Sequence, residues 1–178
     1  MLFRSLDPTD ADAYYNRACA KYLLGDVEGA KRDSEKAVRL KPDYAEALYL
    51  GGVAKGELYN EDDGLEDINA ALKLNPKIAG GLMSMAILLY ESERFDEAVD
   101  KFAEVIASDT SELAAAHYYR GDCFYHLEKK EDACKDWLIS AQLGDKDAVF
   151  IKKNYCDTDA TKIPKKPTRK RHKSVIQF

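Results

Sequence analysis

The sequence predicts an all-α protein, an α-solenoid of about four helix–turn–helix repeats followed by a C-terminal capping helix. Two observations lead to this fold class. Pro8, Pro42 and Pro76 lie 34 residues apart, and a fixed period of that length is typical of stacked helical repeats. Apolar side chains recur at steps of three and four, as at Leu65 and Ile68, which is the spacing of a helix rather than of a strand.

The same prolines set the repeat boundaries. Each ends a similar motif, Leu6-Asp7-Pro8, Leu40-Lys41-Pro42 or Leu74-Asn75-Pro76, and proline marks a stop because it cannot continue a helix. Aligning on the period gives repeats at residues 11–44, 45–78, 79–112 and, after one extra residue, 114–147. A turn divides each repeat, as in Leu24-Gly25-Asp26, where glycine ends one helix and aspartate caps the next.

Small residues occupy two fixed places in every repeat, where they allow two helices to approach closely. They are Ala18, Gly52, Ala86 and Gly121 at place eight, and Ala30, Gly64, Ala98 and Ala133 at place twenty. This pattern, with its period and its terminal proline, resembles the tetratricopeptide repeat family. The stretch from Ala13 to Ala18 is similar to the opening of many bacterial members. The fourth repeat departs most, because it lacks the terminal proline and has Trp137, which we expect in the core.

The two ends of the chain differ from the repeats. Residues 1–10 read either as the end of a preceding, partial repeat or as an improvised N-terminal cap. A further helix, expected to end near Tyr155, covers the apolar face of the last repeat and completes a solenoid over residues 11–156, because terminal repeats need such a cap. Residues 157–178 form a basic tail without helical periodicity, which predicts a flexible segment.

The charge distribution and the cysteine spacing limit the classes of protein to which the chain can belong. Seven of the 27 basic residues lie after Asp159, so the first 159 residues hold 20 basic against 32 acidic residues, a net charge of −12. The four cysteines lack zinc-site spacing, which favours free thiols in a reducing compartment. The absence of a secretory signal and of a long apolar run adds to this, so the prediction is a cytoplasmic protein without a transmembrane segment.

The resemblance implies that the first helix of each repeat lines a concave groove. Two aligned places seven residues apart would then carry six tyrosines and a methionine, with further apolar side chains between them. The predicted aromatic groove residues are Tyr15, Tyr49, Met83 and Tyr118 at place five, Tyr22, Tyr90 and Tyr125 at place twelve, and Ile87 and Tyr119 between them. The predicted acidic groove residues are Asp12, Glu46, Glu57, Glu91 and Asp122.

These side chains indicate an adaptor that binds a protein or peptide. Tyrosine gives a large contact area and one hydroxyl, and an acidic aromatic groove prefers an apolar peptide with basic residues. The alternatives are that the tyrosines pack between helices and that the acids only maintain solubility. Relatives that bind chaperones clamp a carboxylate with basic residues and asparagines, and here the corresponding places hold Tyr15, Cys19, Leu50, Gly80 and Ser84, so that clamp is absent.

Other functions receive less support. No phosphate loop, His-Glu-x-x-His motif or nucleophile pattern is present, so we predict neither an enzyme nor a cofactor or metal site. Residues 160–178 are basic and then apolar, as the groove should prefer, so self-association through this tail is a hypothesis beside that of a solvated tail. Specific nucleic-acid binding is not expected, because the acidic body opposes it. The main alternative is a structural subunit that uses the convex face and the N-terminal end.

Overall fold

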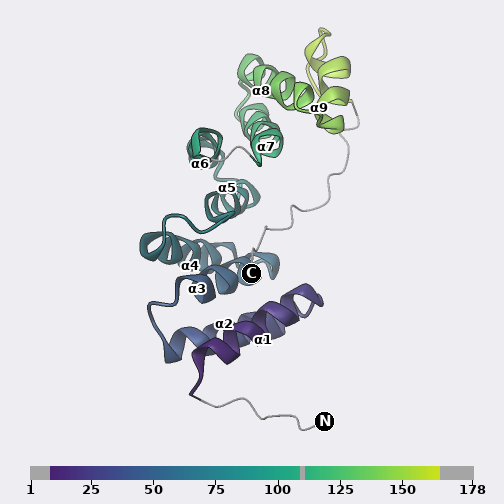
Figure 1. Ribbon diagram of the computed structural model, residues 1–178. Coiled ribbons are helices and arrows are strands. Elements are labelled where there is room, and N and C mark those ends of the chain that lie inside the picture. The colour runs from purple at the N-terminus through teal and green to yellow at the C-terminus, as the bar shows by residue number, and fades with distance from the viewer. Residues whose placement is uncertain (1–8, 109–110, 165–178) are drawn as a thin grey trace. The chain divides into compact units, whose positions relative to one another are not determined.

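The computed structural model describes residues 9–108 and 111–164, and it confirms the all-α repeat fold (Figure 1). The helices follow the predicted order, with α1 (Ala11–Leu23) packed on α2 (Val27–Leu40), α3 (Ala45–Glu57) on α4 (Glu61–Leu74), and α7 (Leu113–His126) on α8 (Lys130–Gln142). The third repeat contributes α5 (Gly81–Glu91) and α6 (Phe95–Ser108). The short α9 (Lys146–Ile151) continues directly into η1, a π-helical turn (Lys152–Cys156). None of the described helices is long and apolar enough to cross a membrane.

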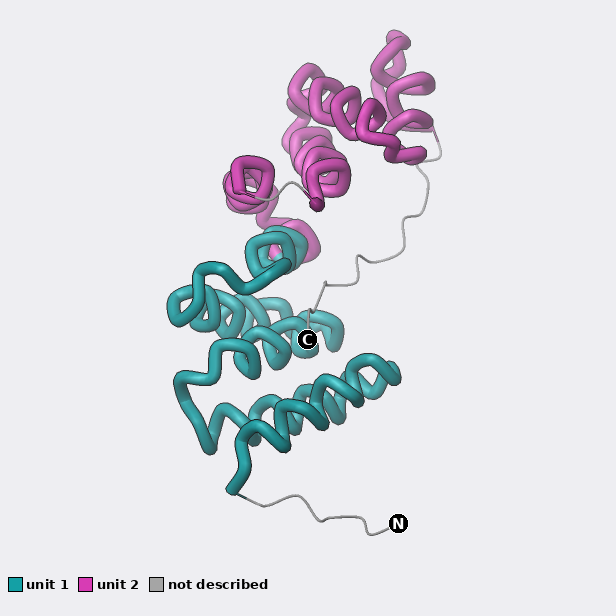
Figure 2. Tube along the Cα trace, in the orientation of Figure 1, with its two compact units in different colours: residues 1–88, 174–178 teal, residues 89–173 magenta. Residues whose placement is uncertain are grey.

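The chain divides into two compact units, with the boundary inside α5 (Figure 2). The described part of unit 1 is residues 9–88, in which α1 packs on α2, α2 on α3 and α3 on α4. The described part of unit 2 begins at Leu89, and there α6 packs on α7, α7 on α8, and α8 on both α9 and η1. The N-terminal residues 1–8 and most of the predicted tail, residues 165–178, lie outside the described residues.

Local sequence explains where the helices begin and end. Asp10, Asp26 and Asp145 each cap a helix with a side-chain oxygen, which accepts hydrogen bonds from otherwise unpaired backbone N–H groups of the first turn. Between α1 and α2, Gly25 adopts a φ of 83°, a conformation that favours glycine and ends a helix. The predicted turn at residues 24–26 is therefore confirmed in its position and in the role of each residue.

The two columns of small residues bring the paired helices into close contact. In unit 1, a Cβ atom added to Gly52 would lie 2.7 Å from the carbonyl oxygen of Gly64, and one added to Gly64 would lie 2.7 Å from that of Gly52. The alanines at the same places in the other repeats, such as Ala30 and Ala98, are fully buried. The expectation that only small side chains fit at these places is confirmed.

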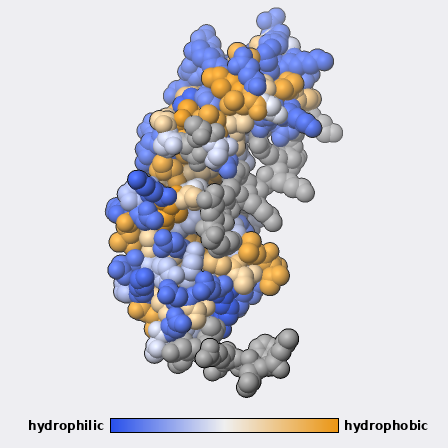
Figure 3. All heavy atoms as spheres, in the orientation of Figure 1, coloured by the Kyte–Doolittle hydropathy of each residue, from blue (hydrophilic) through white to orange (hydrophobic). Residues whose placement is uncertain are grey.

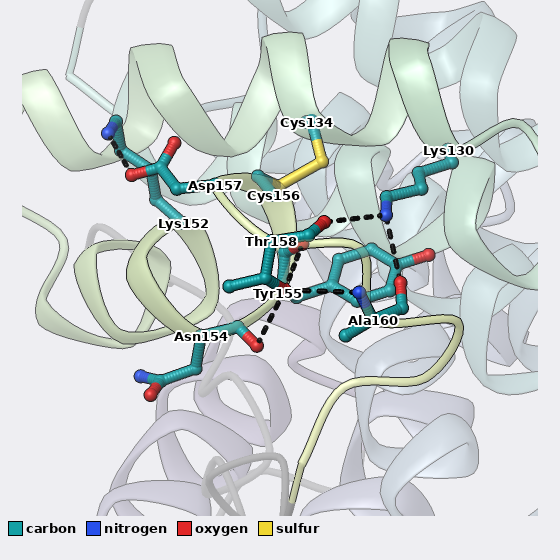
Figure 4. The surroundings of a disulfide bond; sticks show 9 residues. All are labelled: Lys130, Cys134, Lys152, Asn154, Tyr155, Cys156, Asp157, Thr158 and Ala160. Carbon is teal, nitrogen blue, oxygen red and sulfur yellow. Dashed lines mark hydrogen bonds and ion pairs between the residues drawn. A yellow bond between two sulfur atoms is a disulfide. The ribbon is translucent and has the colours of Figure 1, made fainter.

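The C-terminal cap corrects the prediction of four free thiols. Cys134 of α8 and Cys156 at the end of η1 form a disulfide with a Cα–Cα distance of 5.6 Å (Figure 4), while Cys19 and Cys123 are free and buried. Because the two cysteines are 22 residues apart and meet only when the cap folds back on α8, their spacing in sequence did not reveal the pair. The cytoplasmic expectation relied on free thiols and loses that support.

The start of the predicted tail is held against the fourth repeat. The Lys130 ammonium donates hydrogen bonds to the carbonyl oxygens of Thr158, at 3.3 Å, and Ala160, at 2.8 Å (Figure 4). Within the cap, Ile151 and Tyr155 are buried, and Tyr155 packs edge-on against Trp137 with ring centroids 6.1 Å apart. Trp137 is fully buried, as predicted for a core residue. Residues 157–164 therefore belong to the cap rather than to a free tail.

Candidate functional site: the face of the first helices

In unit 1 the side chains of α1 and α3 form a surface that we call the tyrosine–carboxylate face. It consists of Asp12, Tyr15 and Tyr22 of α1, Tyr44 at the start of α3, and Glu46 and Glu57 of α3. The rings of Tyr15 and Tyr44 lie 5.0 Å apart, and the Tyr22 hydroxyl donates a hydrogen bond to Glu57. Asp12 and Glu46 are exposed, and the other four residues are half-buried.

The environment of these tyrosines keeps their hydroxyls protonated. Burial, followed by the neighbouring Cys19, raises the pKa of Tyr15 well above its usual range. Burial and then hydrogen bonding to Asp12 raise the pKa of Tyr44 in the same way. Cys19 lies beneath this face in a cluster with Ala18 and Leu50, and burial raises the pKa of its thiol. The face therefore presents neutral phenol rings beside carboxylates, and it lacks a reactive thiolate.

The rest of the predicted groove in unit 1 is more buried. Tyr49 is 3% exposed, and its hydroxyl shares a hydrogen bond of 2.9 Å with Ser84 of α5. Burial raises the pKa of Tyr49 to about 12, although the bond to Ser84 lowers it. Met83 and Ile87 of α5 are also buried. These side chains join the first helices of neighbouring repeats.

In unit 2 the predicted groove residues form an aromatic cluster. The Tyr90 hydroxyl donates a hydrogen bond of 3.2 Å to Asp122, and burial together with the Asp122 charge raises the pKa of Tyr90 far above its usual range. The Tyr90 and Tyr119 rings meet edge-to-face at 5.5 Å, as do those of Tyr118 and Tyr119 at 5.6 Å. Half-buried Tyr125 packs against Tyr155 of the cap at 5.6 Å.

Burial separates the fourteen predicted groove residues into two groups. The exposed or half-buried group comprises Asp12, Tyr15, Tyr22, Glu46, Glu57, Tyr90, Glu91 and Tyr125. The buried group comprises Tyr49, Met83, Ile87, Tyr118, Tyr119 and Asp122. We expected all fourteen side chains to be open to a groove, but those of the buried group pack and hydrogen-bond within the molecule. Place five is therefore mostly internal, and three of the four place-twelve residues remain partly accessible.

Comparisons with known proteins bear on the fold and the family. A family model described as "Tetratricopeptide repeat" matches residues 83–148. The chain is 39% identical over 79 residues to the mouse protein "Tetratricopeptide repeat protein 36", a match that covers 42% of each chain. It is 25% identical to the human "Mitochondrial import receptor subunit TOM70" over 71% of this chain and 22% of that protein. It therefore spans less than half the length of either relative.

Among solved structures, "YrrB: a TPR protein with an unusual peptide-binding site" superposes with a TM-score of 0.75 at 25% identity, covering 83% of this chain and 77% of that one. This likeness extends over most of the helices, whereas the family model matches only part of the chain. Its helices have the fold of a tetratricopeptide repeat protein, and residues 83–148 match the family model.

The tetratricopeptide repeats of this chain also contain an ion-pair column that sequence reasoning missed. At place twenty-three, Asp33, Asp67 and Asp136 each bind a cation of the first helix of the same repeat. The pairs are Arg17 and Lys21 with Asp33 at 2.5 and 2.9 Å, Lys55 with Asp67 at 2.7 Å, and Arg120 with Asp136 at 2.7 Å. The third repeat has Lys101 at place twenty-three and the uncharged Met85 and Leu89 at the cation places.

Asp33 and Asp136 are the more buried partners of their pairs, whereas the side chains of Lys55 and Asp67 are 17% and 21% exposed. The side chain of Asp136 is 4% exposed, and it also accepts from the His117 ring at 2.7 Å. Burial opposes ionisation of Asp33, but hydrogen bonds from Arg17 and Lys21 outweigh it and lower the pKa of that carboxyl. Recurrence of aspartate at one place, together with a cation sixteen or twelve residues before it, would have predicted this column. It stabilises the helix pairs of the first, second and fourth repeats, and none of its residues is among the predicted groove residues.

Proposed function

We propose that this tetratricopeptide repeat protein is a non-enzymatic adaptor that binds an extended, basic and apolar peptide on the tyrosine–carboxylate face of α1 and α3. The observation that carries the proposal is that half-buried tyrosine rings and exposed carboxylates lie together on that face. Tetratricopeptide repeat proteins generally mediate interactions between proteins, and the similar structure YrrB is described as having an unusual peptide-binding site.

The chemistry of the face determines the class of ligand. Half-buried Tyr15 and Tyr44 rings supply apolar contact area at low entropic cost. Asp12 and Glu46 are exposed and acidic, so they attract Lys or Arg side chains of a peptide and repel acidic ones. Lys41 lies over the Tyr44 ring at 4.5 Å from its centroid and fills the cation–π position there, so a ligand cation on this face pairs with the carboxylates.

A charge-reversal experiment tests this proposal. Peptides selected from a random displayed library against the full chain should be enriched in Lys or Arg with apolar residues. Reversing both exposed carboxylates in Asp12→Lys/Glu46→Lys should weaken such a peptide by about tenfold or more at low salt. The control is Glu66→Lys, a charge reversal at an exposed residue of α4. Selection of acidic peptides, or equal weakening by the control, would contradict the proposal.

The basic tail enters the proposal as a competitor for the same face. Residues 160–178 combine seven basic residues with the ending Ser174-Val175-Ile176-Gln177-Phe178, so they have the composition expected of the ligand. We propose that the part of this segment beyond the cap, residues 165–178, binds the face of its own or a neighbouring chain. A chain truncated before residue 160 should bind a synthetic 160–178 peptide and should bind the selected library peptide more tightly than the full chain. No association of the tail peptide at low salt would refute it.

A second candidate function, a structural subunit of a larger assembly, is favoured by exposed apolar side chains. Figure 3 shows apolar surface over α8, and the exposed large apolar residues of α8 and the cap are Leu138, Ile139, Leu143, Val149 and Phe150. Patches of this kind mark contact surfaces. Light scattering of the full chain and of a Leu138→Lys/Ile139→Lys variant discriminates: a defined oligomer that the variant abolishes supports the assembly, and a monomer in both cases contradicts it.

A further inference from the structure

A pocket of about 500 Å³ lies in unit 2, between the end of α7, the start of α8 and the cap. Its volume is within the range of pockets that hold small ligands. Seven residues line it: Tyr125, His126, Glu128, Lys130, Tyr155, Thr161 and Lys162. It does not include any residue of the tyrosine–carboxylate face, so it is a separate site.

Two covalent and polar restraints hold the wall that the cap contributes. Tyr155 directly precedes Cys156, which the disulfide ties to α8, and the Lys130 ammonium binds the carbonyl oxygens of Thr158 and Ala160 (Figure 4). Thr161 and Lys162 follow immediately after this clamp. The pocket is thus preformed by the fold rather than created by loose chain.

The interior of the pocket favours an aromatic guest. The half-buried Tyr125 ring stands edge-to-face against the buried Tyr155 ring at 5.6 Å, so Tyr155 fixes the orientation of Tyr125, whose partly exposed ring can contact a third ring. Within the described part of the chain, neither of these two hydroxyls forms a hydrogen bond with another residue. Both phenols are therefore available as donors to a ligand oxygen.

The charges of the pocket favour an anion over a cation. Lys130 already lies over the Tyr155 ring, 4.6 Å from its centroid, so the cation–π position on that ring is filled by the protein itself. Lys162 is exposed on the wall, and Glu128 is the one acidic side chain of the lining. Two ammonium groups against one carboxylate make this a basic site on a body whose first 159 residues carry a net charge of −12.

We propose that this pocket is a second binding site, specific for an aromatic side chain flanked by carboxylates in a partner peptide. The aromatic ring packs against Tyr125, and a neighbouring carboxylate accepts from the phenol hydroxyls and pairs with Lys162. The site selects the opposite charge from the tyrosine–carboxylate face, so one chain engages two chemically different segments.

Trp137, the single tryptophan of the chain, is a built-in reporter for this site. It is fully buried and packs against both pocket rings, with centroids 6.0 Å from Tyr125 and 6.1 Å from Tyr155. Titration of the full chain with acetyl-Asp-Phe-Asp-amide should change the Trp137 indole NMR resonance saturably. Acetyl-Lys-Phe-Lys-amide and acetyl-Asp-Ala-Asp-amide should not.

Lys162→Glu should weaken binding of the acidic phenylalanine peptide about three- to fivefold at low salt, since the lysine is an exposed partner. Lys153→Glu makes the same charge change on exposed surface of the cap outside the pocket lining, and it should leave the affinity unchanged. No shift of the indole resonance up to about 5 mM acidic peptide, equal binding of the basic peptide, or equal weakening by Lys153→Glu would each overturn the proposal.

Reduction of the disulfide gives an independent arm. A dithiol reductant supplies two electrons and two protons, the Cys134–Cys156 bond breaks to two thiols, and the reductant becomes a disulfide. Because that bond anchors Tyr155, binding of the acidic peptide should weaken on reduction, whereas an unchanged far-UV circular dichroism spectrum verifies that the chain stays folded. Equal binding of the acidic peptide before and after reduction would contradict the role of the clamped wall. The result is separate from the fate of the face on α1 and α3, because the two experiments vary different units.

Discussion

Two adjacent glycines of α3 provide a test of how closely the paired helices pack. A Cβ atom on Gly52 would lie 2.7 Å from the carbonyl oxygen of Gly64 and 2.8 Å from Cγ1 of Ile68, whereas the nearest atom to a Cβ on Gly51 is Cβ of Ser34 at 3.4 Å. The first distances require the backbone to move, and the second is ordinary van der Waals contact. Substitution by alanine should therefore have opposite effects at the two positions.

The expected magnitudes follow from two competing effects. Replacing a glycine within a helix by alanine favours the helix by about 1 kcal/mol, and this applies to both positions. Overpacking a close contact costs about 1–3 kcal/mol, and this applies only to Gly52, where the obstacle is main chain. Gly51→Ala should stabilise the protein by up to about 1 kcal/mol, while Gly52→Ala should destabilise it by about 1–2 kcal/mol.

Urea unfolding followed by far-UV circular dichroism measures the comparison in the full chain. Both substitutions lie in unit 1 and at adjacent positions of the same helix, so the two variants differ only in what the added methyl group contacts. Gly64→Ala serves as a third variant, because its Cβ meets the Gly52 carbonyl oxygen at 2.7 Å and should also destabilise. If Gly52→Ala unfolds at the same urea concentration as Gly51→Ala, or at a higher one, the close approach of α3 and α4 is refuted.

Three further predictions concern a strained turn and the aspartate column. Tyr59 has a φ of 61° and is 84% exposed. Tyr59→Gly should therefore raise the free energy of unfolding by about 1 kcal/mol, as measured by urea unfolding. Asp136→Ala should lower the free energy of unfolding by about 3 kcal/mol, because it leaves His117 and Arg120 without their buried carboxylate partner. Calorimetry measures this loss. Because the pKa of Asp33 is lowered in the folded state, its contribution to stability is present above its unfolded value of about 3.9 and is lost as the pH falls through the folded value. Asp33→Asn should therefore flatten the stability profile of unit 1 below about pH 4, and an unchanged acid profile would contradict the linkage.

The parts of the fold that the sequence predicted depend on local and periodic constraints. Proline at a fixed period stops a helix wherever it occurs, and small residues at places eight and twenty are required because two helix backbones touch there. Gly25 and Asp26 act through their own backbone and side chain. Such requirements recur in each repeat, so they are visible without coordinates.

The remaining features depend on packing that does not repeat. Cys134 and Cys156 meet because one cap folds back once, and no second copy of that geometry exists in the sequence to reveal it. Burial of Tyr49 depends on the neighbouring repeat rather than on its own helix alone, since its hydroxyl shares a hydrogen bond with Ser84 of α5. A place on the first helix therefore determines which direction a side chain takes, but not how far the next repeat covers it.

The tyrosines of place twelve connect the stacking of repeats with the surface available to a ligand. In unit 1 the Tyr22 hydroxyl binds Glu57, and in unit 2 the Tyr90 hydroxyl binds Asp122, in each case across to the first helix of the following repeat. A tyrosine whose hydroxyl is engaged in this way leaves its ring, rather than its donor, for a ligand. Because the carboxylate partner is also one of the acidic groups of the predicted groove, changing its charge alters both the attraction for a basic peptide and the bond between repeats. Asp12 also hydrogen-bonds to Tyr44 at the start of α3, whereas Glu46 has no such bond among the described residues. Charge reversal at Glu46 therefore separates ligand binding from stacking more cleanly than charge reversal at Asp12.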